Sequence, residues 1–268
     1  MSDQNTNSTE RLLQWQKEKA VAENPRVAKK AERAVAPAAT PEANLLSLAA
    51  TASRLTDAII VGVSCGKDSA ATLDVCSRHF LNVHAYFMYL VKGLEFQEKY
   101  LCYLEGKYGI SIMRIPHWNL SAMFKYGWLR NHSESMMSVP LIKLIDAESY
   151  VKEKLSCEWI AYGHRAQESL ERNAMLKKNG GIDLKGKRVY PLTFWSKKHV
   201  VKYLDKNKIP LAPEYRFLGR SFGAFLEPQL LVIKQHWPND YDKIKEVFPY
   251  VEAIIKRKEF TDKQIPEI

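Results

Sequence analysis

The feature that most constrains the fold is an alternation of short apolar runs with longer amphipathic stretches, which starts near Leu45. The run Ala58–Val63 (AIIVGV) is continuous and rich in β-branched residues, and this predicts a strand buried on both faces. Further strands are predicted over residues 83–90, 111–115 and 159–162. Helices are predicted over residues 69–80, 96–108, 139–155, 169–178, 197–207 and much of 228–258.

Strands separated by helices of this length pair in parallel through right-handed crossovers. We therefore expect an α/β fold with a doubly wound, mainly parallel sheet and a helical C-terminal region. Sheets of this kind bind their ligands at the carboxyl ends of the strands. A functional site is therefore expected where the strands end.

The first 45 residues differ in composition from the rest of the chain. They are rich in Ala, Glu, Lys and Pro, and the stretch AERAVAPAATPEAN is typical of a linker. We expect residues 1–45 to be a flexible N-terminal extension. Two roles stay open for it: a mobile segment without chemistry, or a docking arm for a partner or a second subunit.

Composition excludes several classes of protein. A hydrophobic fraction of 46% excludes wholesale disorder. The four cysteines, Cys65, Cys76, Cys102 and Cys157, form no CxxC pair, so a disulfide scaffold, a zinc ribbon and an iron–sulfur cluster are not expected. No apolar stretch approaches the roughly 18 residues of a membrane span, and the amino terminus lacks the apolar core of a signal peptide. We expect a cytoplasmic protein without membrane contact.

The positive charge is concentrated in one segment. The net charge is +10, and the segment Arg172–Lys202 alone holds nine basic residues and one acidic residue. Tyr190, Phe194 and Trp195 lie among these charges. This pattern suits the phosphates of DNA or RNA together with base stacking. It also suits a solvated face that helps to attract a nucleotide.

The first strand runs directly into Ser64-Cys65-Gly66-Lys67-Asp68-Ser69, and a helix follows. The amino terminus of a helix presents unpaired N–H groups and a partial positive charge, which favour an oxyanion. Gly66 allows a tight turn and close approach of the backbone. Ser64 and Ser69 add hydroxyl donors, and Lys67 adds a compact positive charge.

Asp68 has two candidate tasks in this loop. It can cap the helix through a backbone N–H, or it can hold Mg²⁺ beside the phosphates. The loop is not a Walker A motif, because Val61 stands where that motif has its first glycine and Asp68 follows the Gly-Lys pair. A strand–turn–helix junction with a capping Asp and no ligand would have a similar sequence.

A second motif follows the fourth predicted strand, over residues 163–172 (GHRAQESLER). Gly163 ends the strand, and Arg165 can make bidentate contacts to phosphate or sulfate. Glu168 and Ser169 lie at a helix start, and Arg172 lies one turn later, close enough to share the same anion. An ordinary surface helix with a Glu–Arg pair is the alternative.

These two motifs resemble those of a known family. SCGKDS after a buried strand resembles the PP-loop (Ser-x-Gly-x-Asp-Ser) of the ATP pyrophosphatase superfamily. One branch of this superfamily contains phosphoadenosine-phosphosulfate (PAPS) reductases, the ATP sulfurylase small subunit and Dnd-type phosphorothioation proteins. GHRAQESLER is similar to the Gly-x-Arg-x-x-Glu-Ser-x-x-Arg signature of that branch. The similarity extends over roughly residues 55–250, with weaker matches at residues 93–98 and 191–210.

The resemblance implies a PP-loop nucleotide-binding domain over residues 46–268, with a helical segment from about residue 226. It implies ATP, or a related adenine nucleotide, and Mg²⁺ as ligands, with Mg²⁺ at Asp68. Catalytic roles fall on Lys67, Asp68 and Arg165. The nucleotide and phosphate contacts are expected from Ser64, Cys65, Gly66, Lys67, Asp68, Ser69, Gly163, Arg165, Glu168, Ser169 and Arg172.

Two further arginines, Arg216 and Arg220, lie in a glycine-containing loop. They can grip a terminal phosphate or sulfate, or they can be solvated surface residues. Both alternatives stay open from the sequence.

The sequence also departs from the family. A PAPS reductase attacks sulfur with a thiolate near its carboxyl terminus, and no cysteine follows Cys157 here. Cys65 lies in the loop, where the helix terminus and Lys67 would lower its pKa, although a buried spectator thiol is the other reading. PAPS reductase activity is therefore disfavoured.

The activity that the loop itself supports is cleavage of ATP at the α–β bond, with transfer of AMP to an acceptor and release of pyrophosphate. The acceptor would be sulfate or a nucleic-acid or sulfur-transfer substrate. The sulfurylase relative works with a GTPase partner, so a protein partner or a homo-oligomer is expected here. The alternative is a nucleotide-sensing or DNA- or RNA-binding regulatory protein without turnover.

Overall fold

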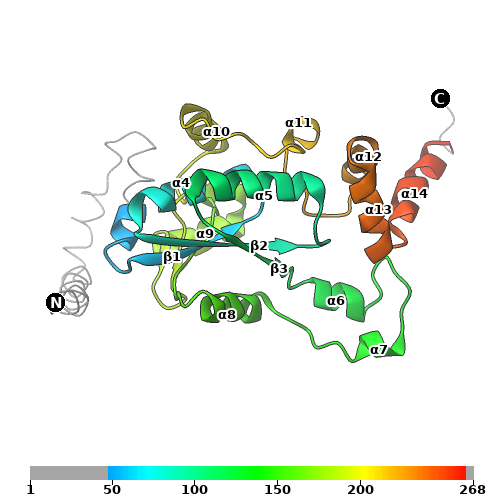
Figure 1. Ribbon diagram of the computed structural model, residues 1–268, viewed down its shortest axis with the longest axis horizontal. Coiled ribbons are helices and arrows are strands. Elements are labelled where there is room, and N and C mark those ends of the chain that lie inside the picture. Colours follow the sequence, from blue (N-terminus) through cyan, green and yellow to red (C-terminus); the bar gives the residue numbers. More distant parts are fainter. Residues whose placement is uncertain (1–47, 264–268) are drawn as a thin grey trace.

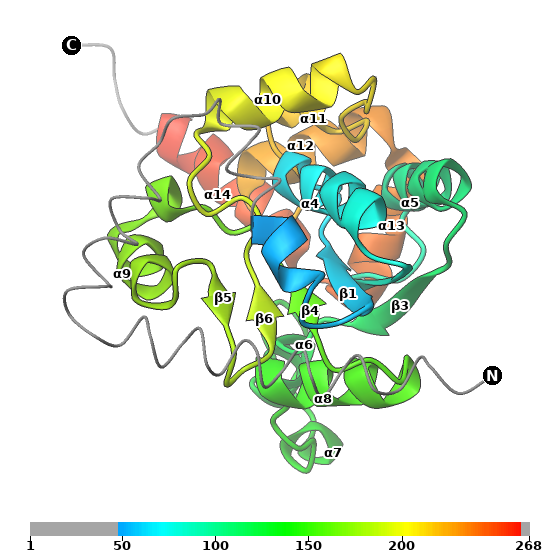
Figure 2. The same ribbon diagram turned by 90° about the vertical axis from the view of Figure 1, so that its left-hand side faces the viewer.

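The computed structural model describes residues 48–263, with side chains described up to residue 257. The extension predicted for residues 1–45 lies outside the described residues. A six-stranded sheet forms the centre of the molecule, in the order β3-β2-β1-β4-β6-β5, and Figure 2 shows most of its strands fanned about β1. All neighbouring pairs are parallel except β5 and β6. The strands are β1 (Ala58–Val63), β2 (Asn82–Tyr89), β3 (Ile112–Pro116), β4 (Ile160–Ala161), β5 (Ile182–Asp183) and β6 (Arg188–Val189).

Helices cover both faces of this sheet (Figure 1). On one face, α4 (Lys67–His79), α5 (Glu95–Tyr108) and α10 (Lys197–Lys206) pack into the main hydrophobic core. On the other face, α8 (Leu144–Lys154) packs against β1 and β2. Alternate residues of β1 serve the two cores, since Val61 belongs to the first and Ile60 to the second. The expected doubly wound α/β fold is confirmed.

The C-terminal helices form a third core at the end of the sheet where β1 and β2 finish. They pack with α6 and with the start of α5 around Phe96, Leu120 and Phe248. None of the helices among residues 48–263 is long and apolar enough to cross a lipid bilayer. The remaining helices are α6 (Leu120–Lys125), α7 (Glu134–Met137), the 3-10 helix η1 (Ala166–Glu168), α9 (Leu170–Asn179), α11 (Tyr215–Leu218), α12 (Glu227–His236), α13 (Pro238–Val247) and α14 (Val251–Lys263).

Three of the differences between predicted and observed elements have a clear local cause. The helix predicted over 139–155 begins at Leu144, because Pro140 disfavours helical backbone before it and the Asp146 carboxylate accepts the Lys143 amide (2.8 Å). The helical stretch over 228–258 is three helices, and Pro238 starts the second because it cannot continue the hydrogen bonds of the first. Strands β5 and β6 were not predicted, because two residues are too few to show an alternating pattern.

Candidate active site

A cavity of about 680 Å³ lies where the strand order reverses. From β1 the chain adds β2 and β3 on one side, and from β4 it adds β6 on the other. The cavity is lined by the carboxyl ends of β1 and β4 and by the loop after each. A reversal point of this kind is the usual ligand site of a doubly wound sheet.

The loop between β1 and α4 is braced by its own serines. Ser69 Oγ donates to the Gly66 carbonyl (2.9 Å) and accepts from the Ser64 amide (3.1 Å). The Ser64 hydroxyl in turn donates to Ser69 Oγ (3.3 Å). Both hydroxyls that we expected to donate to a phosphate are therefore engaged within the loop, and both residues line the cavity.

The tight turn of this loop is carried by Cys65 rather than by Gly66. Cys65 has a φ of +54°, in the left-handed region, whereas Gly66 has a φ of −86°. Space at Gly66 is limited, because a Cβ there would lie 3.2 Å from Ser64 Oγ and 3.4 Å from Ser221 Oγ. The Cys65 thiol is fully buried, and burial raises its pKa, with Glu214 adding to the effect. Of the two alternatives for Cys65, the buried spectator thiol agrees with the structure and the thiol with a lowered pKa does not.

A chain of alternating charges joins the two sequence motifs. The Asp68 carboxylate binds the Lys67 ammonium on one oxygen and Arg165 Nε on the other (2.7 Å). Arg165 Nη2 also reaches Glu168 (3.3 Å), and Glu168 binds Arg172. Asp68 therefore does not cap α4, whose N-cap Gly66 has no side-chain partner. Its carboxylate instead fixes the relative position of the two motifs.

Gly163 makes this junction sterically feasible. A Cβ at Gly163 would lie 2.7 Å from the Asp68 carbonyl carbon and 3.0 Å from the Ser69 nitrogen. The end of β4 therefore lies directly against the first turn of α4. A side chain at position 163 would push the two loops apart.

The predicted site residues divide into three groups. Ser64, Asp68, Ser69, Gly163, Glu168 and Arg172 line the cavity. Cys65, Gly66, Lys67 and Arg165 lie behind that lining, and Ser169 caps α9 by accepting the Arg172 amide (3.1 Å). Arg216 and Arg220 are exposed and do not line this cavity, although their neighbours Tyr215 and Ser221 lie against the loop 64–69.

Tyr215 is a contact of the loop that the sequence did not indicate. The backbone N–H of Lys67, the first residue of α4, donates to the Tyr215 hydroxyl (3.2 Å). This N–H is one of the unpaired donors that a helix start offers to an anion. Tyr215 is 148 residues from Lys67 in the chain, and no local pattern marks it.

A buried polar network forms a second wall of the cavity. Tyr162 donates to Glu148 (2.7 Å), whose side chain is 1% exposed, and Arg188 Nε donates to the same carboxylate (3.1 Å). Because the Tyr162 proton is used in this way, Tyr86 donates to Tyr162 (2.8 Å). The Tyr86 oxygen keeps lone pairs for a ligand that donates a hydrogen bond. No sequence pattern marks this network, whose members come from β2, α8, β6 and the loop after β4.

His164 lies beside this network in nearly parallel contact with two tyrosine rings. Its ring centroid is 5.4 Å from that of Tyr162 and 5.6 Å from that of Tyr190. Burial, with Arg172 adding to the effect, lowers the pKa of His164 to about 4. The imidazole is therefore neutral at neutral pH and offers hydrogen bonds rather than charge.

The basic segment Arg172–Lys202 keeps six exposed lysines, whereas its other three basic residues are ion-paired and two of its three aromatic residues are buried. Lys187 pairs with Glu158, Arg188 with Glu148 and Arg172 with Glu168. Of its three aromatic residues, Tyr190 and Trp195 are buried, so they cannot serve as exposed stacking platforms; Phe194 is 49% exposed. The basic and aromatic side chains of this segment therefore do not form one continuous surface.

Two carboxylates of the cavity are of the type that binds magnesium, and both are ion-paired in this structure, Asp68 with Lys67 and Arg165 and Glu168 with Arg165 and Arg172. Mg²⁺ is held in proteins by one or two carboxylates together with phosphate oxygens and water. Asp68 and Glu168 both line the cavity and supply carboxylate oxygens. Both side chains are partly exposed, at 18% and 21%.

The sequence profile of the phosphoadenosine phosphosulfate reductase domain matches residues 58–229. The chain belongs to this family. The matched range contains both motifs and every strand of the sheet, and the resemblance to the PAPS reductase branch is confirmed. No curated protein sequence matches the chain.

Solved structures with a similar arrangement include three enzymes. The U34-tRNA thiolase NcsA from Methanococcus maripaludis with its [4Fe-4S] cluster is 13% identical with a TM-score of 0.44, and the match covers 84% of this chain and 81% of that chain. PAPS reductase from Candida auris in a phosphate complex is 16% identical with a TM-score of 0.43, over 69% of this chain and 88% of that chain. NH3-dependent NAD synthetase from Campylobacter jejuni with nitrate is 14% identical with a TM-score of 0.43, over 86% of this chain and 99% of that chain.

Proposed function

We propose that this PAPS reductase-family chain binds ATP in the 680 Å³ cavity and cleaves it at the α–β bond. AMP is transferred to an acceptor, and pyrophosphate leaves. The observation that carries the proposal is the Asp68–Arg165 ion pair, which joins the helix-start loop to the second motif at the point of strand reversal. Anion binding at a helix start and ligand binding at a reversal point both support a nucleotide there.

In this proposal the loop binds the phosphates and the basic side chains stabilise the leaving group. The β- and γ-phosphates lie on the loop 64–69. Arg172, which lines the cavity, and the charges of Lys67 and Arg165, which do not line it, stabilise the negative charge that develops on pyrophosphate. Mg²⁺ held by Asp68 and Glu168 supplies further charge neutralisation when bound. An acceptor oxygen attacks the α-phosphorus, and the bond from that phosphorus to the β-bridging oxygen breaks. Positioning and electrostatics supply most of the rate enhancement.

The acceptor, in this proposal, is sulfate or a nucleic-acid or sulfur-transfer substrate, and the protein works in the cytoplasm, with a partner protein or a second subunit. Thiol attack of the PAPS reductase type is disfavoured by the cysteines. Among the described residues, Cys65, Cys76 and Cys157 are buried, Cys102 is exposed on α5, and none of the four lines the cavity.

Pyrophosphate release from ATP and Mg²⁺, with and without sulfate, tests the proposal. The Asp68→Ala, Ser69→Ala double variant should lose release at least 100-fold, because it removes the ion pair and the loop brace together. The matched control is Ser138→Ala, Asp242→Ala, which alters an exposed serine and an exposed aspartate. Equal release by the parent and the double variant would refute the assignment.

Nucleotide binding without turnover is the competing function. If ATP binds and no pyrophosphate forms with sulfate or with nucleic acid present, the regulatory alternative replaces the enzyme. Binding of nucleic acid with a steep salt dependence would support that alternative.

A further inference from the structure

A second cavity, of about 720 Å³, lies beside α11, and we call it the α11 pocket. It is enclosed by the first turns of α5, by the segment 210–217 and by Trp237, which stands between α12 and α13. Figure 1 shows α11 above the start of α5 and beside α12. A cavity of this size suits a small molecule or one unit of a chain molecule.

Tyr215 connects the α11 pocket to the loop 64–69. Its side chain lines the pocket, and its hydroxyl accepts the backbone N–H of Lys67 (3.2 Å). The α11 pocket shares no lining residue with the nucleotide cavity, which the same loop lines through Ser64, Asp68 and Ser69. A ligand in the α11 pocket is therefore separate from ATP in the nucleotide cavity, and it lies next to the loop to which we assign the phosphates.

Three aromatic rings form one wall of the α11 pocket. The ring centroid of Trp237 lies 5.1 Å from that of Phe96 and 5.7 Å from that of Phe217. His236 stacks on Phe217, with centroids 3.8 Å apart and planes at 21°, and this contact fixes the Phe217 ring. Phe217 is nevertheless 42% exposed. An exposed ring held in this way is a platform on which a planar base can stack.

The charged side chains that line the pocket are two cations and one carboxylate. Lys99 of α5 and Arg216 of α11 are exposed, and neither is paired with a carboxylate of the described residues. Both are therefore available to a phosphate. Glu95 lies four residues before Lys99, and no ion pair joins them. Its carboxylate can accept a hydrogen bond from the exocyclic amino group of a base.

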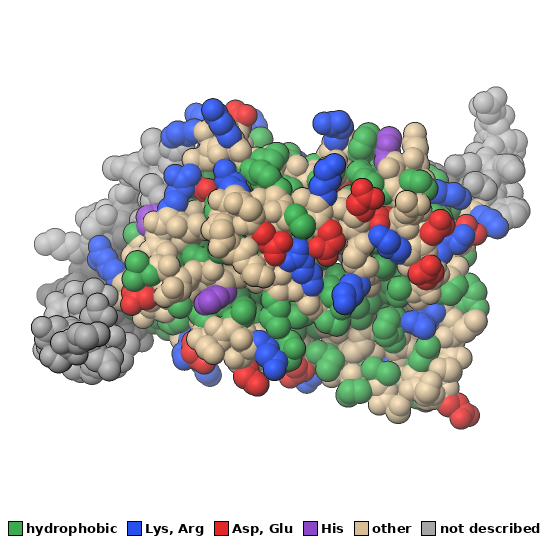
Figure 3. Space-filling view, viewed as in Figure 1, with side chains coloured by type: hydrophobic (Ala, Val, Ile, Leu, Met, Phe, Trp, Pro, Cys, Tyr) green, Lys and Arg blue, Asp and Glu red, His purple; other side chains and the backbone are tan. Residues whose placement is uncertain are grey.

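The positive charge continues along the chain on both sides of the pocket. The exposed charged residues of the segment 206–220 are all basic, namely Lys206, Lys208, Arg216 and Arg220. The one carboxylate of this segment, Glu214, is buried. Figure 3 shows several Lys and Arg side chains along the edge of the molecule that α10 and α11 form. A series of exposed cations suits a phosphate backbone better than it suits a single phosphate.

We infer that the α11 pocket binds one nucleotide of a single-stranded nucleic acid, and that nucleic acid is the acceptor among those proposed above. The base stacks on the ring of Phe217, Lys99 and Arg216 bind phosphates, and Glu95 accepts the amino group of the base. A single strand is favoured because the bases of a duplex are already stacked on their neighbours. The binding stands by itself, whereas the acceptor role rests on the proposed ATP cleavage.

The acceptor role adds one step to this binding. A nucleotide in the α11 pocket places its neighbours in the strand beside the loop 64–69. An unprotonated oxygen of a neighbouring nucleotide forms a bond to the α-phosphorus of ATP. The bond to the β-bridging oxygen breaks, and pyrophosphate leaves with that electron pair. The products are an adenylated strand and pyrophosphate, with no redox change.

Fluorescence anisotropy on the full chain tests the binding. The probes are labelled oligo(dC) and oligo(dT) of about 12 nucleotides, and a duplex of the same length. We expect oligo(dC) to bind about tenfold more tightly than the duplex, with an affinity that falls as the salt concentration rises. Unlabelled oligo(dC) should raise pyrophosphate release from ATP and Mg²⁺ about tenfold over the rate without an acceptor.

Two variants locate the binding. Phe217→Ala removes the stacking platform, and Arg216→Ala removes a phosphate contact. Each should weaken oligo(dC) binding about tenfold and leave ATP affinity within about twofold, and Arg216→Ala should lower the salt slope by about one. Phe194→Ala and Lys198→Ala are the matched controls and should change neither affinity. They alter an exposed phenylalanine and an exposed lysine of the basic segment Arg172–Lys202 that line neither cavity.

Glu95→Ala tests the contact to the base. The parent should prefer oligo(dC) to oligo(dT) about tenfold, because cytosine has an exocyclic amino group and thymine has none. The variant should lose this preference. Its affinity for oligo(dT) should not fall, since a negative charge near the phosphates is removed. Equal binding of the two strands by the parent would overturn the Glu95 contact.

Several outcomes would overturn the inference. It fails if oligo(dC) does not bind, or if it binds the parent, Phe217→Ala and Arg216→Ala equally. Equal weakening by the two controls would place the strand on the basic segment instead. A loss of ATP affinity in Phe217→Ala as large as the loss of oligo(dC) affinity would make the α11 pocket part of the ATP site. Displacement of oligo(dC) by an equal concentration of free CMP would show a mononucleotide site.

The acceptor role and the proposed function fail in different ways. Binding of oligo(dC) without a rise in pyrophosphate release would overturn the acceptor role and support the regulatory alternative. Release with sulfate but not with oligo(dC) would overturn the acceptor role and leave the proposed function standing. Absence of ATP binding would refute the proposed function, while oligo(dC) binding would still report on the α11 pocket.

Discussion

Arg165 Nε donates to Asp68 Oδ1 across 2.7 Å, and this contact joins two motifs that lie 97 residues apart in the chain. The Arg165 side chain is 7% exposed and that of Asp68 is 18% exposed, so most of the pair is shielded from solvent. Shielded ion pairs are costly to break, because one charge is left without its partner. The two loops that line the nucleotide cavity are therefore held as one unit by a single guanidinium.

Arg165→Lys tests this relationship. Lysine keeps the charge but lacks the planar fork that reaches Asp68 and Glu168 together. We expect pyrophosphate release to fall roughly 100-fold, measured as kcat/KM for ATP. Arg78→Lys is the control, because Arg78 also pairs with an aspartate of α4 but is 50% exposed and lies outside the cavity. An Arg165→Lys protein with parental kcat/KM would show that the fork is dispensable.

Gly163→Ala tests the close approach of β4 and α4. The added Cβ would lie 2.7 Å from backbone atoms of Asp68, so we expect a loss of roughly 1–3 kcal/mol in the free energy of unfolding and weaker ATP binding. Gly106→Ala in α5 is the control, because a Cβ there meets nothing within 4 Å. It should raise stability by up to about 1 kcal/mol. Urea unfolding of both variants checks the prediction, and equal effects would contradict it.

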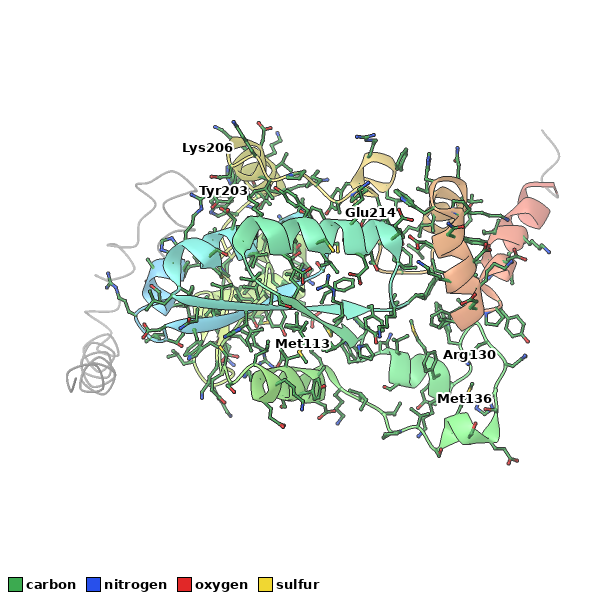
Figure 4. The ribbon with its side chains drawn as sticks, in the orientation of Figure 1. Met113, Arg130, Met136, Tyr203, Lys206 and Glu214 are labelled. Carbon is green, nitrogen blue, oxygen red and sulfur yellow. The ribbon has the colours of Figure 1, made fainter. Side chains whose placement is uncertain are left out.

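Glu214 should make stability depend on pH. It is fully buried between α5 and α11 (Figure 4), and burial raises the pKa of its carboxyl to about 7. The folded state therefore favours the protonated carboxyl. The contribution of Glu214 to the free energy of unfolding is complete below pH 4.5 and is lost as pH rises to 7. At about 1.4 kcal/mol for each pH unit, the loss is roughly 3 kcal/mol.

Glu214→Gln removes this dependence, since the amide stays neutral at every pH. The variant should be more stable than the parent by roughly 3 kcal/mol at pH 8, and this advantage should vanish at pH 4. The difference between the two proteins is the quantity to measure, because the lowered pKa of His164 gives the opposite slope below pH 6.5 in both. Glu134→Gln, at an exposed carboxylate, is the control. A difference that does not change with pH would contradict the prediction.

Thiol labelling should separate the four cysteines by burial. Cys102 is exposed, whereas Cys65, Cys76 and Cys157 are buried with pKa values raised chiefly by that burial. We expect one thiol to react with a disulfide reagent in the folded protein and four to react in urea. Cys102→Ser should abolish the fast reaction. Rapid labelling of Cys65 in the folded state would show that the loop opens.

Features set by local sequence were predicted well. The run 58–63 forms β1 with the predicted bounds, because a strand buried on both faces needs continuous apolar residues. The predictions for α5 and α10 differ from the structure by one residue at one end, since amphipathic periodicity is a local property. Both motifs lie at the carboxyl ends of neighbouring strands, as their positions after β1 and β4 predicted.

The sequence by itself therefore determined the family, the fold class and which two loops meet at the cavity. The tertiary structure decided how individual side chains are used. It placed the Tyr215 hydroxyl on the first amide of α4, linked Glu148 to Tyr162, and left Arg216 outside the cavity. The physical reason is the range of the interaction. Periodicity and caps depend on neighbours within a few residues, whereas these contacts join residues brought together by chain folding and leave no local pattern.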